Sequence, residues 1–253
     1  MSKTVTIVDN LAIAYSQLGK GKDVLLLHGW GDDHRTFDHL AKQLSADYRV
    51  TALDLPGFGG SEPPKTAWDL SNYALLLGQF CDKLALKPYA VIGHSNGGAL
   101  AIHALASRKL QAERLVLLAA SGVRTAKGLK RTALKVVAKT GKLATFWLPP
   151  RYRRRLQMAL YGTVGSDMLV VPELQETFKK TVRQDVQADA EKLTLPTLLI
   201  YGSNDRATPI HEVGYRLVHR IDGAKIVSIE HAGHFVHHDA SNQVEKLITE
   251  FIG

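Results

Sequence analysis

The chain has 253 residues, of which 45% are hydrophobic and 22% charged, a composition typical of a globular protein that can bury one sizeable core. No apolar run approaches the length of a membrane-spanning helix, and the N-terminal residues lack the apolar segment of a signal peptide. We therefore expect no membrane span and a cytoplasmic location. The single cysteine, Cys81, excludes an internal disulfide and a metal-binding cysteine pair, and we expect it to pack inside a helix.

The net charge of +8 is concentrated in one segment. Residues 121–166 contain eleven Lys or Arg and no acidic residue, which leaves 21 basic against 24 acidic residues elsewhere. A solvated basic face is the simplest interpretation of this segment. Attraction of an acidic partner is the functional alternative. No recognised motif accompanies the charge, so we do not expect nucleic acid or a membrane surface to be the partner.

Apolar runs and turn residues predict alternating strands and helices over most of the chain. Two short runs hinged at Asp9-Asn10 predict an antiparallel hairpin at a sheet edge. Continuous apolar runs predict strands covered on both faces, and a period near 3.6 predicts the helices between them. The expected strands are 4–8, 11–16, 23–27, 48–53, 89–92, 114–120, 197–201 and 224–229, and the expected helices are 35–44, 69–86, 99–107, 210–221 and 241–252.

The alternation stops over residues 122–190, where only helical patterns occur. One of them is an apolar stripe made of Leu174, Phe178, Val182 and Val186. The whole pattern predicts an α/β fold with a doubly wound, mostly parallel sheet. Its core comprises residues 1–121 and 191–253, and residues 122–190 form an inserted helical cap.

A short apolar run leads into Gly93-His94-Ser95-Asn96-Gly97-Gly98, and a helical pattern follows. This order of strand, sharp turn and helix is the context that a nucleophile elbow requires. Small residues must flank the strained central position, and Gly93 and Gly97 lie two positions to either side of Ser95. The sequence therefore predicts Ser95 as a nucleophile, whereas an ordinary strand-to-helix turn is the alternative.

A serine nucleophile needs a base and an acid that orients the base. Asp205 follows a buried strand and is the expected acid. The alternative is that Asp205 only caps or forms the turn, a role that Ser203 or Asn204 can fill instead. His234 follows the last strand and is the expected base, with His231 as the alternative. The chain order Ser, Asp, His is that of α/β-hydrolases.

The remaining histidines suggest other roles. We expect His94 to point away from the pocket and His103 to pack against the core. His237-His238-Asp239 resembles a metal-ligand cluster in composition, but adjacent residues in one loop seldom converge on an ion, so we expect no metal.

An oxyanion needs two fixed backbone donors. The amide of Asn96, next to the nucleophile, and the amide of Trp30, in the glycine-rich loop His28-Gly29-Trp30-Gly31, are the expected pair. The expected apolar lining of the substrate pocket is Trp30, Phe58, Phe146, Trp147 and Leu148.

Taken together, these motifs resemble those of α/β-hydrolase-fold serine hydrolases over essentially the whole chain. The resemblance implies a Ser95–His234–Asp205 triad, oxyanion amides at Trp30 and Asn96, and no cofactor. Serine at position 95 argues against dehalogenases and epoxide hydrolases, which carry Asp there. The loops 28–31 and 54–59 also resemble those of pimeloyl-acyl-carrier-protein methyl ester esterases, which hold an acidic carrier protein through a basic cap.

The expected function is hydrolysis of a small carboxylic ester through an acyl-enzyme. Two alternatives remain open. One is an esterase acting on an ester linked to acyl-carrier protein, in which the basic cap binds the acidic carrier. The other is a carbon–carbon bond hydrolase of a ring-cleavage pathway, although such enzymes usually carry Asn at the position of His94.

Overall fold

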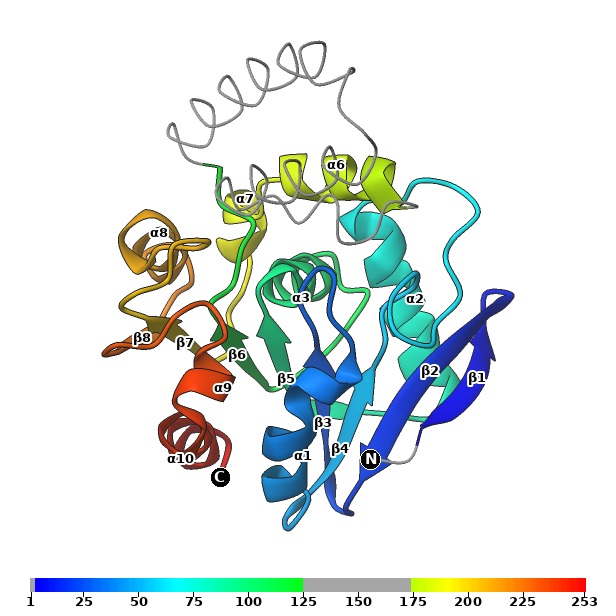
Figure 1. The fold of residues 1–253 in the computed structure, drawn as a ribbon, viewed down its shortest axis with the longest axis horizontal. Coiled ribbons are helices and arrows are strands. Elements are labelled where there is room, and N and C mark those ends of the chain that lie inside the picture. The colour runs from blue at the N-terminus through cyan, green and yellow to red at the C-terminus, as the bar shows by residue number, and fades with distance from the viewer. Residues whose placement is uncertain (1–2, 125–173) are drawn as a thin grey trace, which may run out of the picture.

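An eight-stranded sheet forms the centre of the protein in the computed structural model, which describes residues 3–124 and 174–253 (Figure 1). The strand order is β1-β2-β4-β3-β5-β6-β7-β8. The pairs β1–β2 and β2–β4 are antiparallel, and every other pair is parallel, which confirms the predicted fold class. The strands are β1 (Thr4–Val8), β2 (Leu11–Leu18), β3 (Lys22–Leu27), β4 (Tyr48–Leu53), β5 (Pro88–His94), β6 (Arg114–Leu118), β7 (Thr197–Gly202) and β8 (Lys225–Ile229).

Helices cover both faces of the sheet because successive side chains of a buried strand point to opposite sides. In β3, Val24 and Leu26 join one apolar cluster, whereas Leu25 and Leu27 join the other. The first cluster includes residues of α1 (Asp38–Leu44) and α10 (Ser241–Ile252). The second includes residues of α2 (Leu70–Lys83), α3 (Asn96–Ala106) and α8 (Tyr215–Val218).

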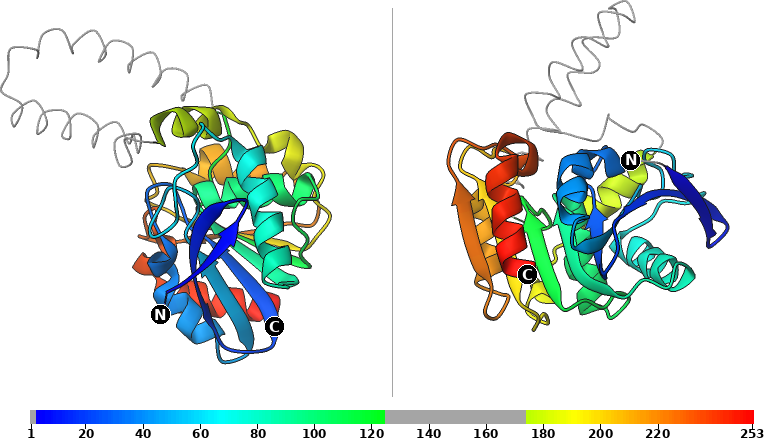
Figure 2. Two further views of the ribbon diagram at one scale, coloured as in Figure 1. Left: turned by 90° about the vertical axis from the view of Figure 1, so that its right-hand side faces the viewer. Right: turned by 90° about the horizontal axis from the view of Figure 1, so that it is seen from below.

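The first two strands form the predicted hairpin, which lies at the opposite side of the sheet from β8 (Figure 2). Asp9 and Asn10 have φ values of 48° and 60°, which the turn requires and which Asn and Asp tolerate better than most residues. β2 continues to Leu18, two residues beyond the predicted end at Ser16, because Gln17 and Leu18 pair with β4.

Three local predictions need correction. The expected helix 35–44 begins as a 3₁₀ turn, His34–Phe37, before α1. The expected helix 210–221 consists of a π-helical turn, Ile210–Gly214, followed by α8. His237 and His238 lie on a short helix, α9 (Val236–Asp239), and not in a loop.

Two helices of the expected cap are described, α6 (Gln175–Arg183) and α7 (Gln187–Ala190), and α6 lies beyond the carboxyl ends of the strands (Figure 1). The predicted apolar stripe is wrong at Val182, which is 58% exposed. Thr177 and Thr181 face inward instead, and Thr177 Oγ1 accepts a hydrogen bond from the Trp68 amide at 3.1 Å. Residues 125–173, which include Phe146, Trp147, Leu148 and all the basic residues of the segment 121–166 except Arg124, lie outside the described residues.

Candidate active site

Ser95 lies between β5 and α3 in a strained turn. Its φ of 51° and ψ of −116° are unusual for a residue with a side chain. The turn is also tight: a Cβ atom on Gly97 would lie 2.2 Å from the Leu27 carbonyl oxygen, and one on Gly93 would lie 2.6 Å from the Gly97 carbonyl oxygen. The flanking glycines are therefore needed for space, as the sequence predicts for an elbow.

The imidazole of His234 lies between Ser95 and Asp205. Its Nε2 is 2.9 Å from Ser95 Oγ, and its Nδ1 is 2.9 Å from Asp205 Oδ2. A carboxylate only accepts, so neutral His234 carries its proton on Nδ1 and presents the Nε2 lone pair to the serine hydroxyl. Residues separated by 139 and 29 positions in the sequence thus form one chain of hydrogen bonds. The alternative base, His231, is exposed and donates its backbone amide to Ser203.

Asp205 is held by Thr208, which sequence reasoning missed. Asp205 Oδ1 accepts from the amides of Ala207 and Thr208 at 2.8 and 2.9 Å, and Thr208 Oγ1 lies 2.7 Å from Asp205 Oδ2. Burial alone would raise the pKa of Asp205, but the hydrogen bond and charge of His234 and the bonds from Thr208 lower it on balance. The carboxylate is therefore ionised at neutral pH and able to orient the base.

The backbone amides of Asn96 and Trp30 have no acceptor among the residues that the structure describes. Asn96 is the first residue of α3, and the first amides of a helix have no acceptor within it. Gly29 adjoins Ser95 closely, because a Cβ atom on this glycine would lie 3.2 Å from Ser95 Cβ. In this loop the amide of Asp32 donates to the Gly29 carbonyl, while that of Trp30 has no acceptor among residues 3–124 and 174–253.

The side chain of Trp30 belongs to an aromatic cluster that joins the core to α6. Its ring centroid lies 4.9 Å from that of Phe58 and 5.0 Å from that of Phe178. Phe58 is buried, whereas Trp30 and Phe178 are half-buried. The structure thus brings together Trp30 and Phe58, the two described residues of the predicted pocket lining. Phe178, which the sequence indicates only as part of a helical stripe, joins the same aromatic cluster.

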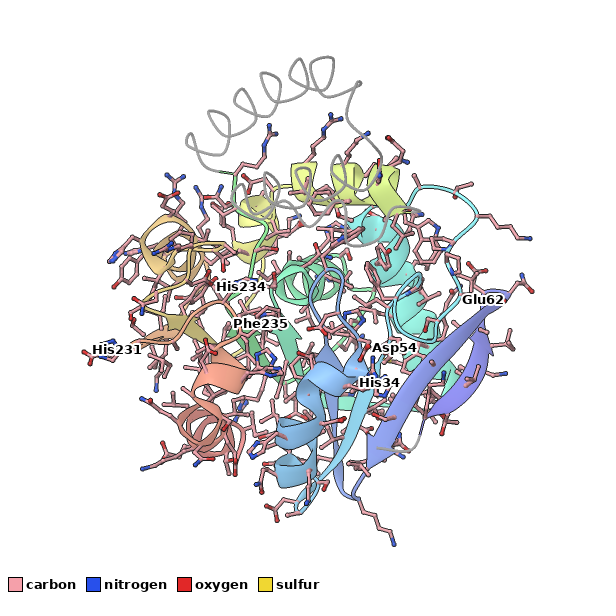
Figure 3. All side chains as sticks on the ribbon, in the orientation of Figure 1. His34, Asp54, Glu62, His231, His234 and Phe235 are labelled. Carbon is pink, nitrogen blue, oxygen red and sulfur yellow. The ribbon has the colours of Figure 1, made fainter. Side chains whose placement is uncertain are left out.

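Buried histidines connect the loops around this site. His28 Nε2 accepts from the Leu55 amide at 2.9 Å, and its Nδ1–H donates to the Gly29 carbonyl at 2.7 Å. Asp54, directly after β4, accepts from the backbone amide of His34 at 2.7 Å and from His34 Nδ1 at 2.6 Å (Figure 3). These contacts fix the loop that carries Trp30 to the loop that carries Phe58.

Asp33, His34 and Asp54 also have ligand atoms close enough to one another to suggest a metal site. However, the carboxylate of Asp54 already accepts from His34 and Gly60, and that of Asp33 accepts from Arg35. The cluster therefore has a structural explanation.

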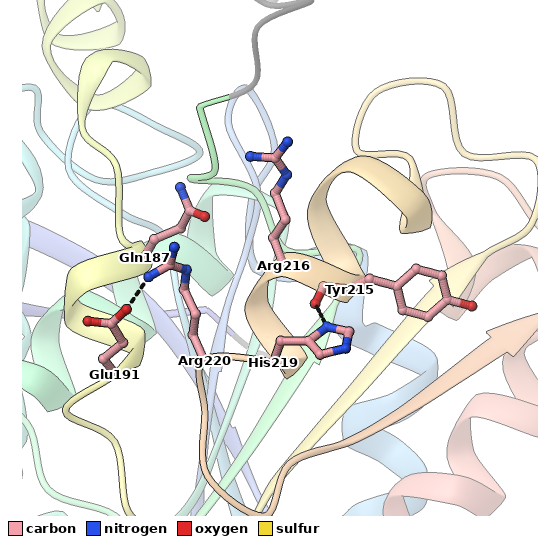
Figure 4. A pocket seen from close by; sticks show the side chains of 6 residues that line it. All are labelled: Gln187, Glu191, Tyr215, Arg216, His219 and Arg220. Atoms are coloured by element: carbon pink, nitrogen blue, oxygen red, sulfur yellow. Dashed lines mark hydrogen bonds and ion pairs between the residues drawn. The ribbon is translucent and has the colours of Figure 1, made fainter.

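A surface depression between α7 and α8 includes none of the residues described above. Arg220 reaches Glu191 across it, and Arg216 points away from that pair (Figure 4). The lining residues are Gln187, Glu191, Tyr215, Arg216, His219 and Arg220. An ion pair on an exposed surface contributes little to stability. The Glu191–Arg220 pair therefore gives no reason to regard this depression as a reaction centre.

Residues 24–247 match the alpha/beta hydrolase family. The chain belongs to this family. The match covers Ser95, Asp205 and His234, and the topology agrees with it. The family is one of hydrolases, and no helix in the described ranges is long and apolar enough to cross a membrane.

Similar proteins include esterases and a meta-cleavage product hydrolase. A pimeloyl-[acyl-carrier protein] methyl ester esterase from Neisseria meningitidis serogroup A is 30% identical over 231 residues, covering 84% of this chain and 71% of the relative. Among solved structures, an esterase from Exiguobacterium antarcticum gives a TM-score of 0.77 at 21% identity, covering 100% of this chain and 99% of the other. A meta-cleavage product hydrolase from Pseudomonas fluorescens IP01 gives a TM-score of 0.74 at 21% identity, covering 98% and 96%.

Proposed function

We propose that the protein is a serine hydrolase that cleaves carboxylic esters through an acyl-enzyme. The supporting observation is the continuous hydrogen-bond chain from Ser95 Oγ through His234 to Asp205, with both distances at 2.9 Å. Ser95 attacks the ester carbonyl while His234 Nε2 takes the hydroxyl proton and returns it to the leaving alcohol. Water activated by the same imidazole then releases the acid.

The amides of Trp30 and Asn96 have the role of oxyanion donors in this proposal. Donors of this kind typically contribute roughly 3–4 kcal/mol of transition-state stabilisation each. The N-terminus of α3 adds a favourable dipole beside Ser95. Trp30, Phe58 and Phe178 form the described part of the pocket wall, and Phe146, Trp147 and Leu148 complete the expected lining from the cap, residues 122–190.

The test is turnover of p-nitrophenyl esters from acetate to palmitate by the parent protein and by Ser95→Ala. The parent should turn over part of the series, and the variant should lose roughly 10⁴- to 10⁶-fold in kcat. Robust turnover by Ser95→Ala refutes the mechanism. A fluorophosphonate should label Ser95 in the parent, and absence of labelling would favour a rival function, a non-catalytic ligand receptor on the same fold.

An ester carried by an acidic acyl-carrier protein is the second candidate. The Neisseria relative is named for such a substrate, and the basic segment 121–166 has the complementary charge. The test compares hydrolysis of a free methyl ester with that of the same ester linked to the carrier. Changing Arg153, Arg154 and Arg155 to Glu should slow only the linked substrate. An unchanged rate on that substrate excludes this candidate.

The carbon–carbon bond hydrolase alternative rests on the fold alone, because the solved meta-cleavage product hydrolase is 21% identical. Turnover of a meta-cleavage product in the absence of any ester turnover would favour it over the main proposal.

A further inference from the structure

A second Ser–His–Asp arrangement lies outside the candidate active site, at the junction of α2, α3 and α7. His103 Nδ1 is 2.7 Å from Asp189 Oδ2, and His103 Nε2 is 3.0 Å from Ser71 Oγ. These distances are close to the two distances of 2.9 Å in the Ser95 site.

The acid of this cluster is fixed in place and ionised. Asp189 accepts from Lys192 Nζ at 2.8 Å through its other oxygen. Burial would raise the pKa of Asp189, but the hydrogen bonds from Lys192 and His103 lower it on balance. The residue that follows α7, Glu191, also pairs with Arg220 at the surface (Figure 4).

An ionised Asp189 determines the tautomer of His103. The carboxylate accepts from Nδ1–H, so neutral His103 presents its Nε2 lone pair to Ser71. A hydroxyl within hydrogen-bond reach of a base that a third group orients is the arrangement that activates a nucleophile. Ser71 is exposed in the first turn of the 14-residue helix α2, so a reagent in solution can reach its hydroxyl.

One element of a turnover site is missing at Ser71. The first three amides of α2 already have acceptors, because Leu70 donates to Gln184 Oε1 and the amides of Ser71 and Asn72 donate to Asp69. No amide of this turn remains to hold an oxyanion, so a group transferred to Ser71 would be released slowly.

We propose that Ser71 is a second nucleophilic serine, which takes up one acyl or phosphonyl group from an activated donor without rapid turnover. With a fluorophosphonate, Ser71 Oγ forms the bond to phosphorus and the P–F bond breaks to release fluoride. The hydroxyl proton passes to His103 Nε2 and then to water.

The experiment uses the full chain with Ser95→Ala, so that its outcome is independent of the proposed esterase function. After treatment with a fluorophosphonate, peptide mass spectrometry should locate the adduct on Ser71. Ser228, an exposed serine on β8, is the internal control, and labelling at Ser71 should be at least tenfold faster. Adding His103→Gln should lower the rate at Ser71 at least tenfold, and adding Asp189→Asn should lower it as well.

Folding of the two variants is checked by circular dichroism and thermal unfolding, in which both should match the Ser95→Ala protein. If His103→Gln fails this check, Asp189→Asn provides the comparison. As a separate control, the protein that carries both Ser71→Ala and Ser95→Ala should form no adduct at position 71. Equal labelling of Ser71 and Ser228, no labelling of Ser71, or a rate at Ser71 that neither variant changes would overturn the proposal.

Discussion

The Nε2–H of His94 donates to the backbone carbonyl of His234 at 3.0 Å. His94 immediately precedes the elbow serine and is almost fully buried, so this bond joins the nucleophile turn to the loop that carries the base. Its Nδ1 has no hydrogen-bond partner among the described residues and lies against Gly29. His94 therefore contacts the loops of all three parts of the candidate site, the nucleophile, the base and the oxyanion amides.

We predict that His94→Leu lowers kcat roughly tenfold or more with little change in KM. Loss of the donor leaves the half-buried His234 carbonyl unpaired, at a cost of about 1 kcal/mol or more, and frees the His234 loop to shift. His94→Gln retains an N–H group and should keep most of the activity. Measurement of kcat and KM for both variants on one p-nitrophenyl ester tests this, and equal effects of Leu and Gln would contradict a role for the hydrogen bond.

The stability of the protein should decrease as the pH falls below about 6.5. Burial, followed by the charge of His234, lowers the pKa of His94 to about 3, and burial also lowers the pKa of His28 and His237. The unfolded chain binds protons at these histidines below pH 6.5, where the folded state does not. Stability is therefore fully present above pH 6.5 and is lost progressively toward pH 3.

Denaturant unfolding at pH 7, 6 and 5 measures this dependence. Each histidine that stays neutral in the folded state adds at most about 1.4 kcal/mol per pH unit to the slope. The free energy of unfolding of His94→Gln should change less steeply with pH than that of the parent between pH 7 and 5. This range lies above the pH at which most carboxyl groups titrate. The same slope in parent and variant would show that His94 takes up its proton without unfolding.

The parts of the fold that follow from local pattern agree with the sequence analysis. β4 has the bounds expected from its apolar run, and Asp9-Asn10 forms the expected turn, since both depend on residues close in the chain. The parallel core also follows, because buried strands alternate with amphipathic helices. The elbow needs glycines at set positions, and the close approaches of Gly93 and Gly97 explain why the motif is informative.

The features that were missed depend on contacts between distant segments. Val182 fits an apolar stripe, but α6 is oriented by Thr177 and by Gln184, which accepts from the Leu70 amide at 2.7 Å. His103 was expected only to pack, and its hydrogen bonds to Ser71 and Asp189 arise from three separate helices. Neither arrangement leaves a periodic signal in the sequence.

Thr208 should contribute to activity through Asp205. Its hydroxyl oxygen lies 2.7 Å from Asp205 Oδ2 and 2.9 Å from the Ala119 carbonyl oxygen. The hydroxyl has one proton and can therefore donate to only one of these oxygens at a time. Thr208→Val removes the hydroxyl at nearly constant volume and should lower kcat roughly tenfold, because a hydrogen bond to a charged group contributes about 1.5–3 kcal/mol. Thr208→Ser is the matched control and should stay within about threefold of the parent. Equal kcat values for the two variants would exclude the hydroxyl from the mechanism.

Phe178 should limit the size of the substrate group that lies beside Trp30. α6 is fixed near the core, since Thr177 and Gln184 accept from the amides of Trp68 and Leu70. The ring centroid of Phe178 is therefore held 5.0 Å from that of Trp30. Phe178→Ala should raise kcat/KM for longer p-nitrophenyl esters relative to acetate.

Val182→Ala is the matched control, because Val182 lies on the same helix and is 58% exposed. It should leave the chain-length profile unchanged, although it also truncates an apolar side chain of α6 to alanine. The comparison requires the ratio of kcat/KM for octanoate to that for acetate in each protein. If both variants alter the chain-length profile equally, α6 as a whole has moved. If Phe178→Ala leaves the profile unchanged, the acyl chain binds away from the Trp30–Phe58–Phe178 cluster.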